Sequence, residues 1–176
     1  DPQRVAAWCE RLDSLGPGLK VGISWRGGTH VSRSPLRSIP LSQWSPIFDA
    51  APAQFVSLQY GNCAGELEEI SARQRKRIVH WQEAIDDYDE TAALVCALDV
   101  VVSVCTAVIH LGGALGRPVW IMVPSNPEWR YGSEGESMPW YPSVRLVRQA
   151  AFGEWPPVIA AVANELHAFE HRRGTT

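Results

Sequence analysis

Short apolar segments alternate along this chain with longer segments whose apolar residues recur every three or four positions. Segments of the first kind predict strands within residues 19–25, 55–58, 77–81, 100–104, 119–123 and 140–148. Segments of the second kind, together with the charged stretch 66–76, predict helices over residues 2–15, from 42 to about 48, and over 66–76, 89–98, 106–115 and 156–169. Strands and helices that alternate at this spacing form parallel sheets. We therefore expect a single Rossmann-like α/β domain, with a doubly wound parallel sheet of about six strands and helices on both faces.

The chain divides at one linker-like stretch, Gly16-Pro17-Gly18. Residues 1–18 are predicted to form an N-terminal helix and linker, and this helix is a candidate to belong to a preceding domain. Residues 19–176 are predicted to form the Rossmann-like domain, because a length near 150 residues is usual for one domain. The first residue is Asp1 rather than methionine, so we expect a fragment or processed product of a longer protein.

The charge balance argues against a general polyanion partner. Lys plus Arg number 16 and Asp plus Glu number 19, which gives a formal net charge of −3. Non-specific nucleic-acid binding depends on neutralising several phosphates, so no nucleic-acid partner is expected. No apolar run approaches the length that spans a bilayer, and we expect no membrane span.

The four cysteines, Cys9, Cys63, Cys96 and Cys105, show no CxxC spacing. The pattern indicates neither a zinc site nor a disulfide framework, and a reducing, cytoplasmic location fits it best. The dinucleotide fingerprint GxGxxG is also absent, so a nicotinamide or flavin cofactor is not supported. We therefore expect neither a cofactor nor a metal.

Glycines and an arginine follow the first predicted strand. Open parallel sheets bind ligands beyond the carboxyl ends of their strands. Gly27 and Gly28 would let backbone amides approach an anion there, and Arg37 could hold its phosphate. A solvated loop with incidental arginines is the alternative.

The fourth predicted strand passes without a loop into a helix, with Cys105, Thr106 and Ala107 at the junction. The free N–H groups and positive dipole end of such a helix suit a diphosphate, and Thr106 adds a hydroxyl. His110 is either a ligand or, equally well, a histidine satisfied inside the fold. The Cys105 thiol is reactive if solvent reaches it, but we favour a small buried hydrophobe.

Two further segments reach the same edge of the predicted sheet. Asp86 and Asp87 follow the third strand, where carboxylates can bind ribose hydroxyls. Residues 124–131 begin an aromatic, proline-rich stretch that is too long for a simple turn, and long loops are often functional. Its Arg130 is a candidate substrate contact, with a cover over the sheet edge as the alternative.

Three segments resemble a known family: 89–94 (DETAAL), 98–107 (LDVVVSVCTA) and 110–118 (HLGGALGRP). They resemble the C-terminal half of the family 9 glycosyltransferases, the heptosyltransferase-like enzymes of GT-B fold. The similarity covers almost the whole chain from residue 19 onward and is most specific over 110–118. Segments 37–41, 129–130 and 140–143 also resemble the branch that is fused to tetratricopeptide repeats in bacteria.

The resemblance implies that this domain holds a nucleotide diphosphate sugar as donor. Arg37 stands where the family has a phosphate-binding lysine. The segment Cys105-Thr106-Ala107, with His110, stands where an Asp-Thr-Gly segment and a histidine line the diphosphate and sugar. Asp86-Asp87 falls at the family's nucleoside pocket.

Two departures from the family pattern matter. Cys105 replaces a carboxylate able to bind sugar hydroxyls, and Arg37 keeps the charge of a lysine but changes the geometry. The family's catalytic base lies in an N-terminal acceptor domain that this chain lacks, so the resemblance implies no catalysis in isolation and assigns no catalytic residue. The alternative function is a non-catalytic binding or scaffold module attached to tetratricopeptide repeats. A sugar-nucleotide epimerase is a weaker third hypothesis.

Overall fold

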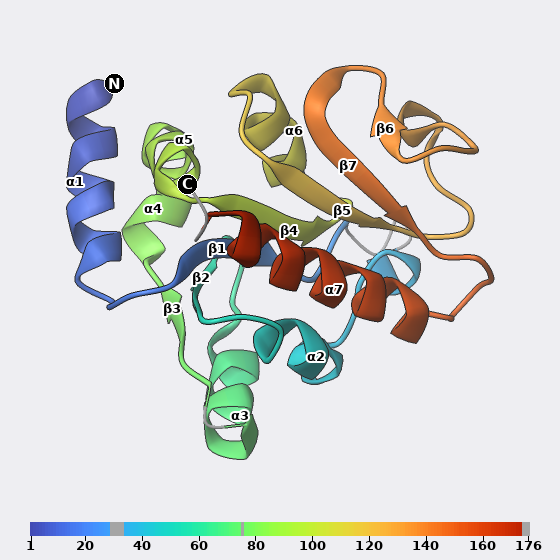
Figure 1. The fold of residues 1–176 in the computed structure, drawn as a ribbon, viewed down its shortest axis with the longest axis horizontal. Coiled ribbons are helices and arrows are strands. Elements are labelled where there is room, and N and C mark those ends of the chain that lie inside the picture. The colour runs from blue at the N-terminus through green and yellow to red at the C-terminus, as the bar shows by residue number, and fades with distance from the viewer. Residues whose placement is uncertain (29–33, 75, 174–176) are drawn as a thin grey trace.

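The computed structural model describes residues 1–28, 34–74 and 76–173, which form a seven-stranded sheet between two layers of helices (Figure 1). The strands are β1 (Leu19–Ser24), β2 (Ala53–Ser57), β3 (Ile78–His80), β4 (Val100–Val104), β5 (Val119–Val123), β6 (Ser137–Met138) and β7 (Tyr141–Arg148). Their order is β3-β2-β1-β4-β5-β7-β6. All neighbouring strands are parallel except the pair β6 and β7.

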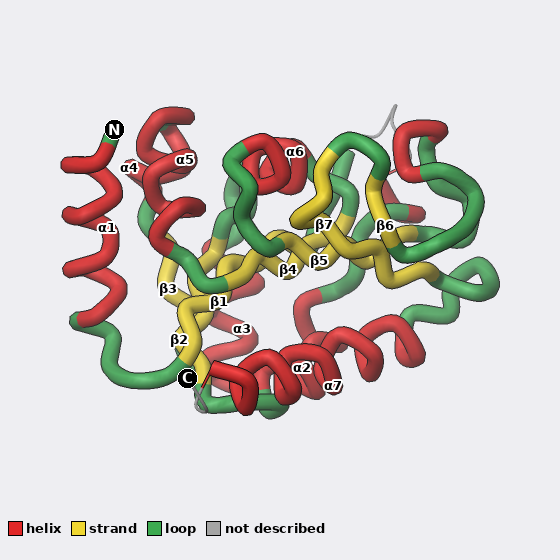
Figure 2. The backbone as a smooth tube through the Cα atoms, turned by 45° about the horizontal axis from the view of Figure 1, so that its top comes forward, coloured by secondary structure: helices red, strands yellow, loops and turns green. Residues whose placement is uncertain are grey.

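The helices cover both faces of this sheet, as Figure 2 shows. On one face lie α1 (Pro2–Asp13), α4 (Gln82–Asp86), α5 (Tyr88–Ala97) and α6 (Ala107–Ala114), and on the other lie α2 (Ser45–Phe48), α3 (Ala64–Gln74) and α7 (Pro156–Arg173). Short 3-10 turns occupy Ser34–Leu36 (η1), Leu41–Trp44 (η2) and Trp129–Tyr131 (η3). Within the described residues, no helix is long and apolar enough to cross a membrane.

Each face of the sheet has its own apolar core because side chains alternate along a strand. Val100 and Val102 of β4 pack with α2, α3 and α7, whereas Val101 packs with α1, α5 and α6. All three side chains are at most 1% exposed. Burial on both faces explains why β4 is apolar at every position except Ser103.

The predicted α/β fold is confirmed, with one correction to the sheet. It has seven strands rather than about six, because the two-residue β6 pairs antiparallel with β7 inside the long loop after β5. The predicted N-terminal helix is α1, and it packs on α5, with Trp8 donating a 2.8 Å hydrogen bond from Nε1 to Glu90. Its assignment to a unit separate from 19–176 stays a prediction.

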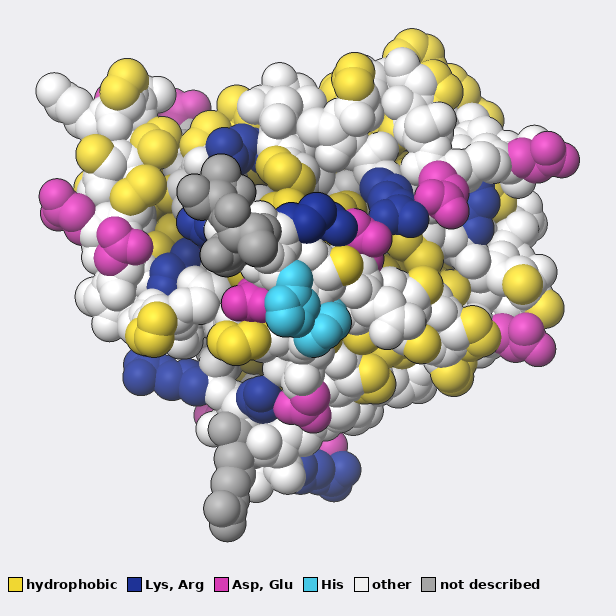
Figure 3. Space-filling model, viewed as in Figure 1, with side chains coloured by type: hydrophobic (Ala, Val, Ile, Leu, Met, Phe, Trp, Pro, Cys, Tyr) yellow, Lys and Arg dark blue, Asp and Glu magenta, His cyan; other side chains and the backbone are white. Residues whose placement is uncertain are grey.

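Charged side chains of both signs are interspersed over the face seen in Figure 3 rather than gathered by sign. This distribution agrees with the small net charge of the chain.

Candidate functional site

The strand order places a crevice between the carboxyl ends of β1 and β4. The chain leaves β1 toward β2 and β3 on one side and returns to β4 on the other side, so the direction of the strand order reverses between β1 and β4. Ligands of open α/β sheets bind at such a switch point. A cavity of about 290 Å³ opens there, lined by residues after β1 (Arg26, Gly28), after β2 (Leu58, Gln59, Tyr60) and at the start of α6 (Thr106, Ala107, Val108), with Ser24 and Ser34.

The wall of this crevice requires glycine at position 27. A Cβ atom on Gly27 would lie 2.5 Å from the carbonyl oxygen of Cys105 and 3.3 Å from that of Arg37. The loops after β1 and β4 therefore touch backbone to backbone. Gly28 follows with φ of 78°, a conformation that favours glycine.

The N-terminus of α6 faces this cavity without a side-chain cap. Thr106 occupies the N-cap position in an extended conformation, but its hydroxyl lies 3.0 Å from Ser103 Oγ and does not bond to the first-turn amides. Thr106 and Ala107 line the cavity. The uncapped amides and the positive end of the helix dipole are suited to an anion.

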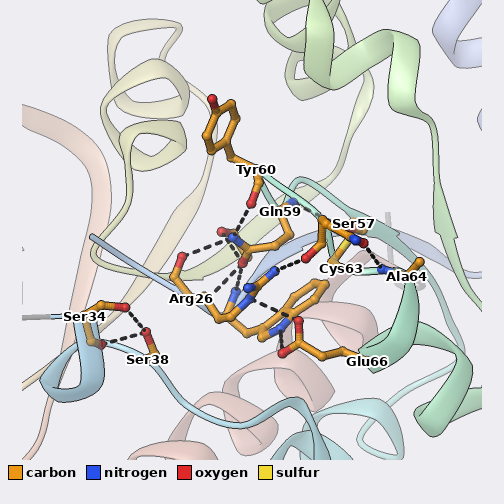
Figure 4. Close-up of polar contacts among 12 residues, drawn as sticks. Arg26, Ser34, Ser38, Ser57, Gln59, Tyr60, Cys63, Ala64 and Glu66 are labelled. Atoms are coloured by element: carbon orange, nitrogen blue, oxygen red, sulfur yellow. Dashed lines mark hydrogen bonds and ion pairs between the residues drawn. The ribbon is translucent and has the colours of Figure 1, made fainter. Parts of the chain in front are cut away.

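Gln59 ties the loop after β1 to the loop after β2 (Figure 4). Its Oε1 accepts hydrogen bonds from the backbone N–H groups of Trp25 (3.0 Å) and Arg26 (2.8 Å). Its Nε2 donates to the carbonyls of Arg26 (3.2 Å) and Tyr60 (3.1 Å). The side chain is only 4% exposed. Reasoning from the sequence missed Gln59, although a glutamine directly after a buried strand was a signal.

Arg26 was not among the predicted site residues, although it directly precedes the two predicted glycines. Its guanidinium turns toward the start of α3, where Nη2 donates to the Asn62 carbonyl at 2.8 Å and Nε lies 3.0 Å from Glu66 Oε2. The other oxygen of Glu66 accepts from the buried Trp25 indole at 2.8 Å. Figure 4 shows this group beside Gln59. Glu66 thus orients Arg26 at the cavity wall.

Arg37 and Arg130 meet at one carboxylate. Glu128 Oε1 pairs with Arg37 Nη1, and Glu128 Oε2 pairs with Arg130 Nη1. The Arg37 side chain is 13% exposed, and its buried Nε has no acceptor among the described residues. Two arginines predicted from separate loops therefore come together on a residue that was not predicted.

His110 lies near two tyrosine rings. Its ring centroid is 6.3 Å from that of Tyr131 and 5.9 Å from that of Tyr141. Burial lowers the pKa of His110, and the Arg130 cation lowers it further, while Glu128 opposes both. The imidazole is therefore neutral at pH 7, which suits a hydrogen-bonding role rather than a cationic one.

Cys105 is a buried thiol, as the favoured interpretation predicted. It is 3% exposed, and burial raises its pKa to about 12. A neutral thiol neither binds sugar hydroxyls strongly nor acts as a nucleophile.

Cys105 is expected to resist iodoacetamide in the folded protein at neutral pH, because the reactive thiolate is scarce and the sulfur is covered. The exposed Cys9 provides an internal positive control. Mass spectrometry of labelled peptides, with and without denaturant, measures both. Fast native labelling of Cys105 that a nucleoside diphosphate suppresses would instead place the thiol in the crevice.

A second cavity of about 640 Å³ adjoins the first, with Tyr60 in the lining of both. Asp86 accepts from Gln82 at 2.7 Å, and Gln82 Oε1 lies 3.1 Å from His80 Nε2. His80 Nδ1 lies 3.1 Å from Ser57 Oγ. This chain of hydrogen bonds places Asp86 at the cavity with amide and imidazole groups beside it.

Asp87 has a separate structural role. Its carboxylate caps α5, accepting from the backbone N–H of Asp89 at 2.8 Å, and it lies 3.5 Å from Arg4. The hydrogen bond from the Asp89 amide lowers the pKa of this carboxyl. Asp86 thus lines the second cavity and Asp87 does not, although both aspartates line a further hollow of about 610 Å³ beside Trp8 and Arg11.

The structure resembles ADP-heptose LPS heptosyltransferase II of E. coli, with a TM-score of 0.58 and 17% sequence identity. The fold is heptosyltransferase-like. The similarity covers 97% of this chain and 53% of the heptosyltransferase chain. The sequence is also 38% identical over 173 residues to Protein FlbA of Caulobacter vibrioides, covering 96% of this chain and 28% of FlbA. No family model matches the chain.

Proposed function

We propose that this domain binds a nucleotide diphosphate sugar as the donor half of a heptosyltransferase-like glycosyltransferase. The observation that carries the proposal is the crevice at the switch point, where the backbone contact at Gly27 meets the uncapped N-terminus of α6. Thr106 and Ala107 would receive the diphosphate through backbone amides. Arg37 and Arg130 would neutralise the charge that develops on the leaving group.

The nucleoside would occupy the second cavity. The exposed Tyr60 offers a ring between the two cavities, and Asp86 and Gln82 offer polar groups for a ribose or base. A volume of about 640 Å³ lies in the usual range for small-molecule sites. Contact of the ligand with Asp87 stays a prediction, because that carboxylate already caps α5.

Transfer itself would need groups that this domain does not supply. The proposed partner is an N-terminal acceptor or repeat domain that would bring the acceptor and the catalytic base, in a cytoplasmic bacterial protein with tetratricopeptide repeats. FlbA, of which the chain covers 28%, leaves room for such parts.

A non-catalytic binding module is the second candidate function. The neutral, buried Cys105 favours it, because a thiol replaces the carboxylate expected to hold sugar hydroxyls. Such a module would still bind the nucleotide, but the sugar would add little to the binding affinity.

The donor hypothesis predicts that a nucleotide sugar stabilises the domain. ADP-, GDP-, UDP- and CMP-linked sugars are titrated by calorimetry and thermal shift, with the CMP sugar as the single-phosphate comparison. At a hundredfold excess over Kd, the ligand should add about 2.7 kcal/mol to the free energy of unfolding. Free nucleosides serve as the control without phosphate. If no nucleotide moves the melting temperature at millimolar concentration, the proposal fails.

A further inference from the structure

Glu128 is held by two arginines that come from different parts of the chain. Arg37 follows η1, and Arg130 lies in η3, and each binds a different oxygen of the Glu128 carboxylate. The Glu128 side chain is 32% exposed, compared with 13% for Arg37. The Glu128 side chain is therefore partly accessible to water, whereas the Arg37 side chain is largely buried.

The geometry of this clamp is that of an oxyanion site. Two guanidinium groups each present an N–H to a separate oxygen, which is also how arginines bind a phosphate. The buried Arg37 Nε still has no acceptor among the described residues, so the guanidinium retains one donor that Glu128 does not use.

The backbone of Arg37 adjoins the crevice between β1 and β4, and Glu128 lines a separate hollow of about 330 Å³ with Ser125 and Trp129. A Cβ atom on Gly27 would lie 3.3 Å from the Arg37 carbonyl oxygen, and the charges of Arg37, Glu128 and Arg130 all act on the pKa of the Cys105 thiol, one residue before Thr106. A diphosphate bound at the start of α6 would have to extend beyond the lining of the first cavity to reach these arginines.

The loop that carries Glu128 and Arg130 is anchored independently of the clamp. Arg148 donates to the carbonyls of Tyr131, Gly132, Glu134 and Gly135. The η3 turn closes through a 3.0 Å hydrogen bond from Tyr131 N to the Glu128 carbonyl. The Glu128 side chain can thus rotate away while the backbone and Arg130 stay in place.

We propose that Glu128 is an internal competitor for the diphosphate: its carboxylate occupies the oxyanion site of Arg37 and Arg130 until the ligand displaces it. This inference rests on the proposed function, whose diphosphate site it regulates. The empty site carries two positive charges, and the bound carboxylate cancels one of them. Anions that bind the two arginines more weakly than Glu128 does would therefore not displace its carboxylate.

The competition predicts tighter anion binding when Glu128 is removed. If the open clamp makes up about a tenth of wild-type molecules, Glu128→Gln should lower Kd for ADP and for inorganic pyrophosphate about tenfold, because only the open fraction binds. Isothermal titration calorimetry measures both ligands. Glu134→Gln is the matched control, since it removes the same charge from an exposed side chain of the same loop. It should change Kd less than about twofold.

Glu128→Asp separates competition from simple charge. Its carboxylate keeps the charge but is one methylene too short to bridge both arginines, so it should also tighten binding, by a smaller factor. This variant also keeps the test decisive if Glu128→Gln does not fold. In an Arg37→Ala background, the gain from Glu128→Gln should disappear.

The outcomes separate this inference from the proposed function. Wild-type binding that neither Glu128 variant strengthens overturns the competition and leaves the donor site standing. A gain that persists in the Arg37→Ala background also overturns it, because the effect would then be general electrostatics. Absence of binding by the wild type and both variants overturns the donor site itself.

Discussion

Replacement of Gln59 by alanine is expected to lower the free energy of unfolding by about 2–4 kcal/mol, since each buried donor left without an acceptor costs about 1–3 kcal/mol. The substitution removes the acceptor of the Trp25 and Arg26 amides, at 3.0 and 2.8 Å. It also removes the donor to the Arg26 and Tyr60 carbonyls. The loop after β1 would lose its attachment to the loop after β2, and nucleotide binding in the crevice would be lost with it.

Urea unfolding and nucleotide titration measure the two effects of Gln59→Ala. Gln59→Met, which preserves most of the volume, should cost nearly as much and thus assign the loss to hydrogen bonds rather than to a cavity. Gln54→Ala is the control, because the Gln54 side chain donates only one hydrogen bond to the described residues, an exposed one of 3.1 Å to the Pro17 carbonyl. Wild-type stability in Gln59→Ala would show that water replaces the side chain and that Gln59 does not organise the crevice.

The layers of the fold were predictable because burial on both sides of a parallel sheet leaves a pattern in the sequence. The strands β4, which is apolar except for Ser103, and β5, which is wholly apolar, can be recognised from their own residues, because every residue in them is buried. The strand β6 could not be predicted in this way. It has two residues, one of them exposed, and it exists only because β7 lies beside it.

The part of the candidate site that depends on the direction of the strands was predictable from the sequence. Gly27 and Thr106 follow parallel strands, and the carboxyl ends of parallel strands meet at one edge. Which side chains pair with one another within the site depends instead on tertiary packing. Arg37 and Glu128 are 91 positions apart, and no local pattern links them. Asp86 and Asp87 are neighbours with different roles, because only Asp87 lies where the first amides of α5 need an acceptor.

Gly27→Ala is expected to destabilise the domain and to abolish nucleotide binding. The new Cβ atom would lie 2.5 Å from the Cys105 carbonyl oxygen and 3.3 Å from the Arg37 carbonyl oxygen. Both contacts are with backbone, so no side chain can rotate away to relieve them. Forcing a methyl group into such a space typically costs about 1–3 kcal/mol of stability. The relaxation would separate the loops after β1 and β4, which form the two walls of the proposed diphosphate site.

Gly65→Ala provides the control for Gly27→Ala. A Cβ atom on Gly65, near the start of α3, would have no heavy atom within 4 Å. That variant should therefore keep nucleotide affinity and gain up to about 1 kcal/mol of stability, the helix preference of alanine over glycine. Urea unfolding gives the stability of each protein, and calorimetric titration with a nucleoside diphosphate gives its affinity. If Gly27→Ala matched the wild type in both measurements, the loops after β1 and β4 would be able to move apart without cost. Their close approach would then not define the site. If Gly27→Ala instead loses more affinity for the nucleoside diphosphate than its loss of stability explains, Gly27 determines the shape of the anion site.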